Sequence, residues 1–338
     1  MNYKINVLDQ TPYLENGDAQ QSFQHTIKLA KLAESLGYSR FWLSEHHQSN
    51  SVAGSSPEVL ISHLLAHTKT IRIGSGGIML SHYSPFKVAE NFAVLENLAP
   101  GRIDLGVGKA PGGLPAATKA LQYDRQSFED NFNEKLTLLQ QFVTNTIPEN
   151  SPFSGLTVSP ETVNPTPIYV LGGSANSAKE AAALKLDYVF AAFINGSKEV
   201  LQQASSIYKT LHPKGKFIVA FSMIGAETDE EAQRLGEKQK VFKIKLTSGK
   251  TYSLASKEQA YEFGKQINEP FEVYEEKATV QAGSPATIKK LLDDYHTAYN
   301  VDEFIFHTIL PTNEERERSY TLLSPKNLAQ LKEVAYAE

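Results

Sequence analysis

The amino-acid sequence predicts an α/β fold in which eight strands alternate with helices and close into a (β/α)8 TIM barrel. Short β-branched runs alternate with amphipathic segments along the 338 residues, and glycines and polar residues gather where the runs end. An open dinucleotide-binding sheet would carry Gly-x-Gly-x-x-Gly directly after its first strand. Here the first run ends in Asp9-Gln10-Thr11-Pro12 instead. Both observations favour the barrel.

The expected strands are short apolar runs separated by helical patterns. They cover residues 4–8, 40–44, 71–75, 102–108, 167–171, 188–193, 217–224 and 303–309. Amphipathic helices are expected over residues 20–36, 56–68, 85–98, 127–143, 197–211 and 285–299, with another from about 177 and a helical tail from about 313. Residues 228–279 are polar, helical in pattern and longer than a crossover needs. We therefore expect an inserted helical or loop segment before the last strand, and one domain over residues 1–338.

Composition and charge argue against several classes of function. The net charge is −5, whereas a nucleic-acid-binding protein needs a basic surface for phosphate groups. The sequence has no run of about 18 apolar residues, so no membrane span is expected. The first residues lack the apolar core of a signal peptide, so a cytoplasmic location is expected. The absence of cysteine excludes disulfides, thiol nucleophiles and cysteinyl metal sites.

A glycine-rich strand is the clearest sign of a ligand site. The run over residues 71–80 begins as a buried strand and then breaks on Gly74, Gly76 and Gly77. Glycine weakens a strand unless a bulge or a closely approaching ligand needs the bare backbone. Ser84 and Pro85 follow as the N-cap and first residue of a helix. The stretch is therefore predicted to be the carboxyl end of a barrel strand, where barrels place their ligands.

Other polar residues are expected to meet at the same end of the barrel. The segment 173–177 enters a helix, where unpaired N–H groups and the helix dipole favour a phosphate. Capping of that helix by Ser174 or Asn176 explains the same residues equally well. Lys109, at the neighbouring strand end, is either a second phosphate contact or a solvated lysine.

His46 and His47 are adjacent, so in a continuing strand they point to opposite faces and chelate a metal poorly. One of them is either an acid, base or hydrogen-bonding group that faces the mouth or, as is more common for a lone histidine, a structural residue, and the other is expected to pack against the outer helix. No His-x-His pair or Gly-x-Ser-x-Gly elbow is present, so no metal site or hydrolase is predicted. Glu90 and Arg102 are expected to form a buried structural ion pair.

Four ordered motifs resemble the bacterial-luciferase-like flavin monooxygenases, the luciferase-like class of flavin-dependent oxidoreductases. They are Phe41-Trp-Leu-Ser-Glu-His-His47, the glycine-rich run 71–80, Lys87-Val-Ala-Glu90 and Pro100-Gly-Arg-Ile-Asp-Leu-Gly-Val-Gly108. The resemblance continues through Pro167–Ser174 and Thr228–Ala232 to Ser319–Leu323, and so covers nearly the whole chain. It implies a barrel that binds FMN at its mouth.

The resemblance also implies roles for single residues. His46 matches the catalytic histidine, Gly76-Gly77 matches a non-proline cis peptide beneath the flavin ring, and Lys109 and the 173–177 loop match the phosphate contacts. The expected cofactor-binding residues, from these matches and from the strand ends, are Leu8, Asp9, Glu45, Gly76, Gly77, Ile78, Lys109, Gly172, Gly173, Ser174, Ala175 and Ser177.

The activity implied is an FMN-dependent monooxygenase that uses reduced FMN from a separate reductase, together with O2, to oxygenate a small organic substrate such as an aldehyde. A homodimer packed through the early helices is also implied. The alternatives are hydride transfer with a deazaflavin and a non-catalytic flavin-binding protein. Three departures from the family pattern stand out: Lys109 for an arginine, Ser81-His82-Tyr83 for Pro-Asn-His, and Lys185 for a glycine. The first predicts a lower affinity for the phosphate group.

Overall fold

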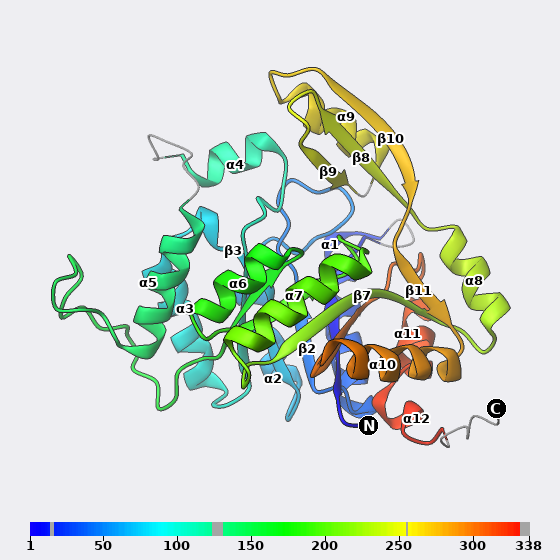
Figure 1. Cartoon of the computed structure of the whole chain (residues 1–338), viewed down its shortest axis with the longest axis horizontal. Helices are drawn as coiled ribbons and strands as arrows, with labels where there is room; N and C mark the ends of the chain where they lie inside the picture. Colours follow the sequence, from blue (N-terminus) through cyan, green and yellow to red (C-terminus); the bar gives the residue numbers. More distant parts are fainter. Residues whose placement is uncertain (14–16, 124–130, 255, 332–338) are drawn as a thin grey trace.

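The computed structural model describes residues 1–13, 17–123, 131–254 and 256–331. Within these residues, eight parallel strands form a closed barrel (Figure 1). They are β1 (Lys4–Asp9), β2 (Arg40–Leu43), β3 (Arg72–Met79), β4 (Ile103–Gly108), β5 (Ile168–Gly172), β6 (Asp187–Ala191), β7 (Phe217–Gly225) and β12 (Glu303–His307). Their order is β7-β12-β1-β2-β3-β4-β5-β6, and pairing of β6 with β7 closes the ring. The predicted barrel is confirmed.

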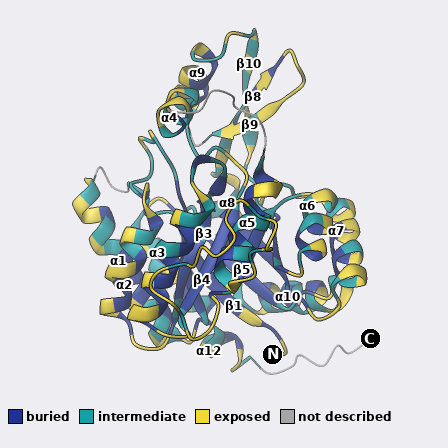
Figure 2. Ribbon diagram, turned by 90° about the vertical axis from the view of Figure 1, so that its left-hand side faces the viewer, coloured by how far each residue is buried: buried dark blue, intermediate teal, exposed yellow. Residues whose placement is uncertain are grey.

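Helices cover the outside of the barrel, with buried strands inside and exposed helix faces outside (Figure 2). They are α1 (Ala19–Leu36), α2 (Pro57–His67), α3 (Pro85–Leu98), α5 (Phe132–Thr144), α6 (Ala175–Ala183), α7 (Lys198–Leu211), α10 (Pro285–Tyr299), α11 (Asn313–Leu322) and α12 (Pro325–Leu328). As expected, Gly37 ends α1 with a left-handed backbone, and Ser84 caps α3. The start expected for α5 falls in 124–130 and the end of the tail in 332–338, both outside the described residues.

Side chains fill the barrel in layers. At its amino-terminal end, Arg40 donates to both carboxylate oxygens of Asp104, at 2.8 and 2.7 Å, and to Glu303 at 2.8 Å. Above this ionic layer lies an apolar cluster formed by Leu8, Trp42, Tyr169, Val189, Ile218, Ala220 and Ile305. The barrel is therefore a packed core, and ligands can enter only above the apolar layer.

The prediction that Glu90 and Arg102 form an ion pair is wrong. Glu90 pairs with Lys87 on the surface of α3 at 3.4 Å, and Arg102 donates to Thr68 and to the carbonyl of Ile71. Glu90 lies in the second turn of α3, which starts at the carboxyl end of the barrel, whereas Arg102 precedes β4 at the opposite end. The length of the helix separates the two charges.

The glycine-rich strand carries an irregularity at the point that the sequence singles out. Ser75 pairs with Leu105 and Ile78 with Val107, so two residues of β3 lie opposite one residue of β4. The two residues are Gly76 and Gly77, and the peptide bond between them is cis, as the family resemblance implies. A short 3-10 turn, η1 (Leu80–His82), then leads into α3.

The inserted segment between β7 and β12 differs from the expectation of helices and loops. Residues 228–279 contain α8 (Asp229–Glu237), α9 (Lys257–Lys265) and an antiparallel sheet of β8 (Lys240–Leu246), β9 (Thr251–Leu254) and β10 (Phe271–Lys277). In β8, lysines alternate with apolar residues, so Ile244 and Leu246 face Phe263 of α9 while the charges face outward. Because one face of the strand is charged, the two-residue alternation that is typical of a strand was not recognised in the sequence. The next strand, β11 (Val280–Gly283), pairs with β7.

This segment stands over one end of the barrel and reaches two of its loops (Figures 1 and 2). Leu114, in the loop after β4, is buried against the apolar side of the small sheet. Beyond it, α4 (Pro115–Leu121), which the sequence did not predict, is hydrogen-bonded to the segment: Gln266 Oε1 accepts from Ala116 N–H at 2.9 Å. Gln259 donates to Ser49, after β2, at 3.3 Å. The segment, called the cap below, therefore spans the mouth from β7 to the loops after β2 and β4.

None of the helices in the described residues is both long and apolar enough to cross a membrane.

Candidate active site

Bare backbone forms part of the barrel mouth on β3 and β4. A Cβ atom on Gly76 would lie 2.8 Å from Leu8 Cδ1, and one on Gly77 would lie 2.8 Å from the carbonyl oxygen of Gly106. Packing therefore excludes side chains from both positions. At the end of β4, a Cβ on Gly108 would meet nothing within 4 Å, so this strand end borders open space. These three glycines leave backbone without side chains on β3 and β4, and they are called the glycine platform below.

Glu45 joins the ends of β2 and β3 beside this platform. Its carboxylate is fully buried and accepts hydrogen bonds from Met79 N–H at 3.0 Å, Tyr83 Oη at 2.6 Å and His47 Nε2 at 2.7 Å. Burial, followed by the hydrogen bond to Glu45, raises the pKa of Tyr83. Glu45 therefore holds the walls of the mouth together; contact between its carboxylate and a cofactor stays a prediction.

The two adjacent histidines have different neighbours. The His47 ring lies 6.1 Å from that of His82 in η1, because Glu45 draws it toward β3. His46 Nδ1 lies 3.1 Å from Ser44 Oγ, and its Nε2 has no hydrogen-bond partner among the described residues. Burial lowers the pKa of His46 to about 4, so the ring is neutral at pH 7.

Asp9 occupies a joint between the barrel and two helices. Its carboxylate is fully buried and accepts from Thr26 of α1 at 2.6 Å and from Arg316 of α11 at 2.5 Å. Leu8, the preceding residue, points inward beneath Gly76. The described contacts thus give Asp9 a role in fastening α1 and α11 to the end of β1, while Leu8 supports the glycine platform.

The loop between β5 and α6 has the geometry of a capped helix start. Ser174 Oγ accepts from Ser177 N–H at 3.2 Å, which confirms the capping alternative for this residue. Ser177 Oγ lies 2.8 Å from Tyr188 Oη, and this hydroxyl fills the space beside Gly172. Asn195 Nδ2 donates a hydrogen bond to the carbonyl oxygen of Gly173 at 2.8 Å. The loop adjoins the end of β4, where Lys109 is exposed.

The unusual residues after β3 are structural. His82 is buried; its Nε2 lies 2.7 Å from the carbonyl oxygen of Pro111, and its Nδ1 lies 2.9 Å from Gln122 Nε2. Because a carbonyl only accepts, Nε2 donates this hydrogen bond. Lys135 of α5 donates to the carbonyl oxygens of Ser81 and Tyr83 at 2.9 and 2.7 Å. The departures Ser81-His82-Tyr83 therefore fix the wall beside the glycine platform.

Sequence reasoning missed two polar residues at the mouth. His307 ends β12, and its Nδ1 lies 3.4 Å from Ser222 Oγ on β7. The expected eighth strand ran to residue 309, which placed His307 inside a strand rather than at its end. The rule that functional residues lie at strand ends would have found it had the strand been ended at its true boundary.

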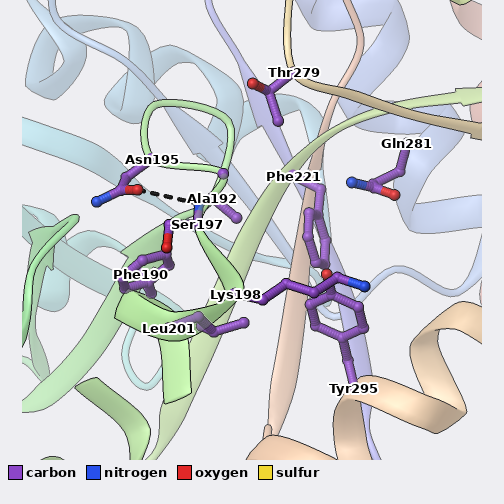
Figure 3. Close-up of a pocket in the computed structure, with 11 residues that line it drawn as sticks. Phe190, Ala192, Asn195, Ser197, Lys198, Leu201, Phe221, Thr279, Gln281 and Tyr295 are labelled. Carbon is purple, nitrogen blue, oxygen red and sulfur yellow. Dashed lines mark hydrogen bonds between the residues drawn. The ribbon is translucent and has the colours of Figure 1, made fainter. Parts of the chain in front are cut away.

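The described part of the chain contains no cluster of three or more histidine and carboxylate side chains that could bind a metal ion. A small pocket lies between β6, the start of α7, β11 and α10 (Figure 3). Phe190, Phe221 and Tyr295 line it, and Asn195 Oδ1 accepts from Ser197 N–H at its edge. None of the predicted site residues lines this pocket.

Comparisons with known proteins agree with this architecture. A family model described as luciferase-like monooxygenase matches residues 4–299. N-acetyl-S-alkylcysteine monooxygenase of Bacillus subtilis (strain 168) is 40% identical over 329 residues, covering 96% of this chain and 98% of the relative. The crystal structure of apo-MsnO8 superposes with a TM-score of 0.76 at 32% identity, covering 98% of this chain and 99% of that one.

A more distant structure shares the fold. The oxygenating constituent of 3,6-diketocamphane monooxygenase of Pseudomonas putida, solved in complex with FMN, has a TM-score of 0.70 at 18% identity, covering 98% of this chain and 99% of that one. The resemblance seen in the sequence motifs is confirmed. The chain belongs to the luciferase-like monooxygenase family of oxidoreductases.

Proposed function

We propose that the protein is an FMN-dependent monooxygenase that oxygenates a small organic substrate, using reduced FMN supplied by a separate reductase and O2. The observation that carries the proposal is the glycine platform, where packing keeps Gly76 and Gly77 bare and Gly108 borders open space. A planar ring can approach bare backbone more closely than it can approach side chains. Family membership points to a flavin as that ring.

The phosphate group would lie one strand further along the barrel. Ser174 begins α6, which has nine residues, so the positive end of its dipole and its unpaired N–H groups face the mouth. Lys109 follows β4, which pairs with β5, and supplies a positive charge next to this helix start. Ring platform and phosphate site are therefore neighbours on β3, β4 and β5, which is the arrangement that an elongated flavin nucleotide needs.

Bound FMN would supply the electrons that activate O2, and the protein would supply binding, orientation and exclusion of water. His46 is the group we assign to proton handling. Its Nδ1 is held by Ser44, and the ring stays neutral above about pH 4. The Nε2 atom is thus able to accept a proton or donate a hydrogen bond at neutral pH.

The substrate class follows from the curated relative. That protein is named for N-acetyl-S-alkylcysteines and is 40% identical along its whole length. We propose thioethers of this class as the first substrates to test, with aldehydes as the second class.

A homodimer is also part of the proposal. Val59 of α2 and Val94 and Leu98 of α3 are 69%, 45% and 63% exposed, and they belong to neighbouring helices. Apolar residues gathered on adjacent helices are typical of an interface. Size-exclusion chromatography with light scattering should give twice the 37.3 kDa chain mass, and Leu98→Lys should shift the protein toward the monomer.

The decisive experiment is an anaerobic titration with reduced FMN, followed by admission of 18O2 and N-acetyl-S-methylcysteine or an aldehyde. Tight binding and an 18O-labelled organic product are expected, and His46→Ala should bind FMN but form much less product. Flavin binding without a labelled product from either class would favour the non-catalytic alternative. Failure to bind FMN, with binding of a deazaflavin, would favour hydride transfer.

A further inference from the structure

His307 faces the interior of the barrel mouth. Side chains of a strand alternate between its two faces, and Ile305, two residues earlier, belongs to the apolar cluster inside the barrel. On the neighbouring strand, Ala220 belongs to the same cluster, and Ser222 follows two residues later. The register pairs His307 with Ser222 directly. Both side chains therefore form the layer immediately above the apolar core, at the level of the mouth.

This layer lies across the barrel from the glycine platform. In the closed order of the eight strands, β7 is opposite β3, and β12 is opposite β4. Gly76 and Gly77 stand on β3, and Gly108 ends β4. A planar cofactor on that platform leaves the half of the mouth formed by β7 and β12 open to a second molecule. The cap leaves the barrel after β7, one of the two strands of this half.

Contacts with two neighbouring side chains fix the orientation of the His307 ring. Its side chain is buried, with Nδ1 at 3.4 Å from Ser222 Oγ and the ring centroid 5.8 Å from that of Phe193. Its Nε2 has no hydrogen-bond partner among the described residues. His46 has a similar contact with Ser44, the residue that follows β2. Two imidazoles thus present free Nε2 atoms from opposite sides of β1.

The charges around His307 show what kind of group it would receive. Arg316 is the nearby cation, and its guanidinium already binds the buried carboxylate of Asp9 at 2.5 Å. Burial and the charge of Arg316 lower the pKa of His307 and keep its ring neutral at pH 7. A neutral imidazole and a hydroxyl offer dipolar hydrogen bonds rather than charge, which suits an amide or carbonyl group better than a carboxylate.

We propose that His307, oriented by Ser222, positions the substrate by a hydrogen bond from its Nε2 to an uncharged amide or carbonyl group, on the side of the mouth opposite the flavin platform. This inference rests on the proposed function. The two imidazoles then have separate roles, because His46 serves the reaction and His307 serves substrate placement and selectivity.

The test uses the FMN-loaded protein and N-acetyl-S-methylcysteine as the probe, whose acetamide is the uncharged group. Calorimetry measures probe binding to the unmodified protein, His307→Leu, His307→Gln and the exposed-histidine control His63→Gln. We expect His307→Leu to raise the dissociation constant and KM for the probe about tenfold, the effect of one lost hydrogen bond. Its kcat and its FMN affinity should change less than twofold. Glutamine, whose amide nitrogen mimics Nε2, should restore most of the affinity, and His63→Gln should have no effect.

Each other outcome has a separate meaning. Failure of the unmodified protein to bind FMN contradicts the proposed function before any variant is compared. Binding of FMN but not of the probe contradicts the substrate group assigned to His307. Equal probe binding by His307→Leu and the unmodified protein overturns the positioning role. A loss of FMN affinity in His307→Leu as large as that in Lys109→Ala would make His307 a cofactor ligand instead. Circular dichroism of each variant verifies that it is folded.

Discussion

His46 and His307 are two imidazoles held neutral inside the barrel mouth, and this has a measurable effect on stability. Burial lowers the pKa of each to about 4, below the value of about 6.5 in an unfolded chain. The unfolded protein therefore binds more protons between these values, and stability must rise with pH across this window.

Acidification from pH 7 towards pH 4 should lower the free energy of unfolding, by up to about 3 kcal/mol for each imidazole. Urea denaturation at pH 7, 6 and 5 measures the change, and His307→Gln should remove the share that belongs to His307. The carboxylate of Glu303, with a pKa lowered to about 2 by Arg40, loses its contribution only below about pH 4.5, outside this range. Parallel pH profiles for the two proteins would contradict the assignment.

The glycine platform makes a second prediction at the same scale. In Gly77→Ala the new methyl group would stand 2.8 Å from the backbone oxygen of Gly106, which cannot move as a side chain can. We expect a loss of about 1–3 kcal/mol in unfolding free energy and weaker FMN binding. Gly108→Ala is the matched control, because its methyl group meets open space and should leave stability nearly unchanged. Equal stability of both variants would show that β3 and β4 shift locally to make room for the methyl group.

Single residues also show how far the sequence predicts the site. The glycines, His46, Glu45 and the 173–177 loop all lie at strand ends, because a barrel collects those ends on one face. The sequence could not show that Asp9 accepts a hydrogen bond from Arg316, because the two residues lie 307 positions apart in the chain. It also hid His307, because apolar residues on both sides of β12 leave no signal for the strand end.

Among the secondary-structure elements, α6 ends in an unusual way. Lys185 follows it with φ of +58°, in the left-handed region where glycine is favoured, and its Nζ donates to the carbonyl of Leu211 at 2.6 Å. Lys185→Gly should relieve about 1 kcal/mol of backbone cost and lose an exposed hydrogen bond, for a small net gain in melting temperature. Lys185→Ala keeps the backbone cost and loses the bond, so it should melt below both. A glycine variant that melts below alanine would refute this account.

The packing of the cap against the barrel can be tested at one residue. Leu114 is the barrel-side residue buried against Ile244, Leu246 and Phe263. Leu114→Ala should weaken this contact and speed hydrogen exchange in β8, β9 and β10, while exchange in the eight barrel strands stays unchanged. Val163→Ala, at an exposed position outside the cap and the proposed dimer interface, is the control. Faster exchange throughout the barrel would mean that cap and barrel unfold as one unit.

The elements differ in how readily the sequence predicts them. The barrel strands are buried on both faces and read as apolar runs, so their number and order were predicted. The cap strands are solvated on one face, and their lysines and glutamates form cross-strand pairs such as Lys243 with Glu276 at 2.6 Å. Such alternation resembles a polar helix when pairing partners are unknown. The additional α4 is short, and its docking on the cap stabilises it.

For the molecule as a whole, an ionic layer seals the amino-terminal end of the barrel. Asp104 is fully buried and accepts from Arg40, from Arg72 and from Trp42 Nε1 at 2.9 Å. Removing its charge leaves the guanidinium group of Arg72 without its carboxylate partner and leaves Arg40 with Glu303 alone. Asp104→Asn should therefore cost about 3–5 kcal/mol of stability, measured by chemical denaturation. Lys290→Gln, which breaks the exposed pair with Asp294, is the control and should cost less than about 1 kcal/mol. Similar losses in both variants would show that burial adds nothing to this network.

The attachment of the cap bears on how this fold diversifies. The cap departs after β7 and returns through β11, and these two strands are hydrogen-bonded neighbours, with Gly225 paired with Gly283. The returning chain enters β11 at Val280, which is paired with Ser222, so the two connections lie about 11 Å apart, three residues along the strand and one strand across. A segment with adjacent ends can be lengthened, shortened or exchanged without breaking a hydrogen bond of the eight-stranded ring. Natural selection can thus alter which molecules reach the mouth while the cofactor platform beneath is inherited intact.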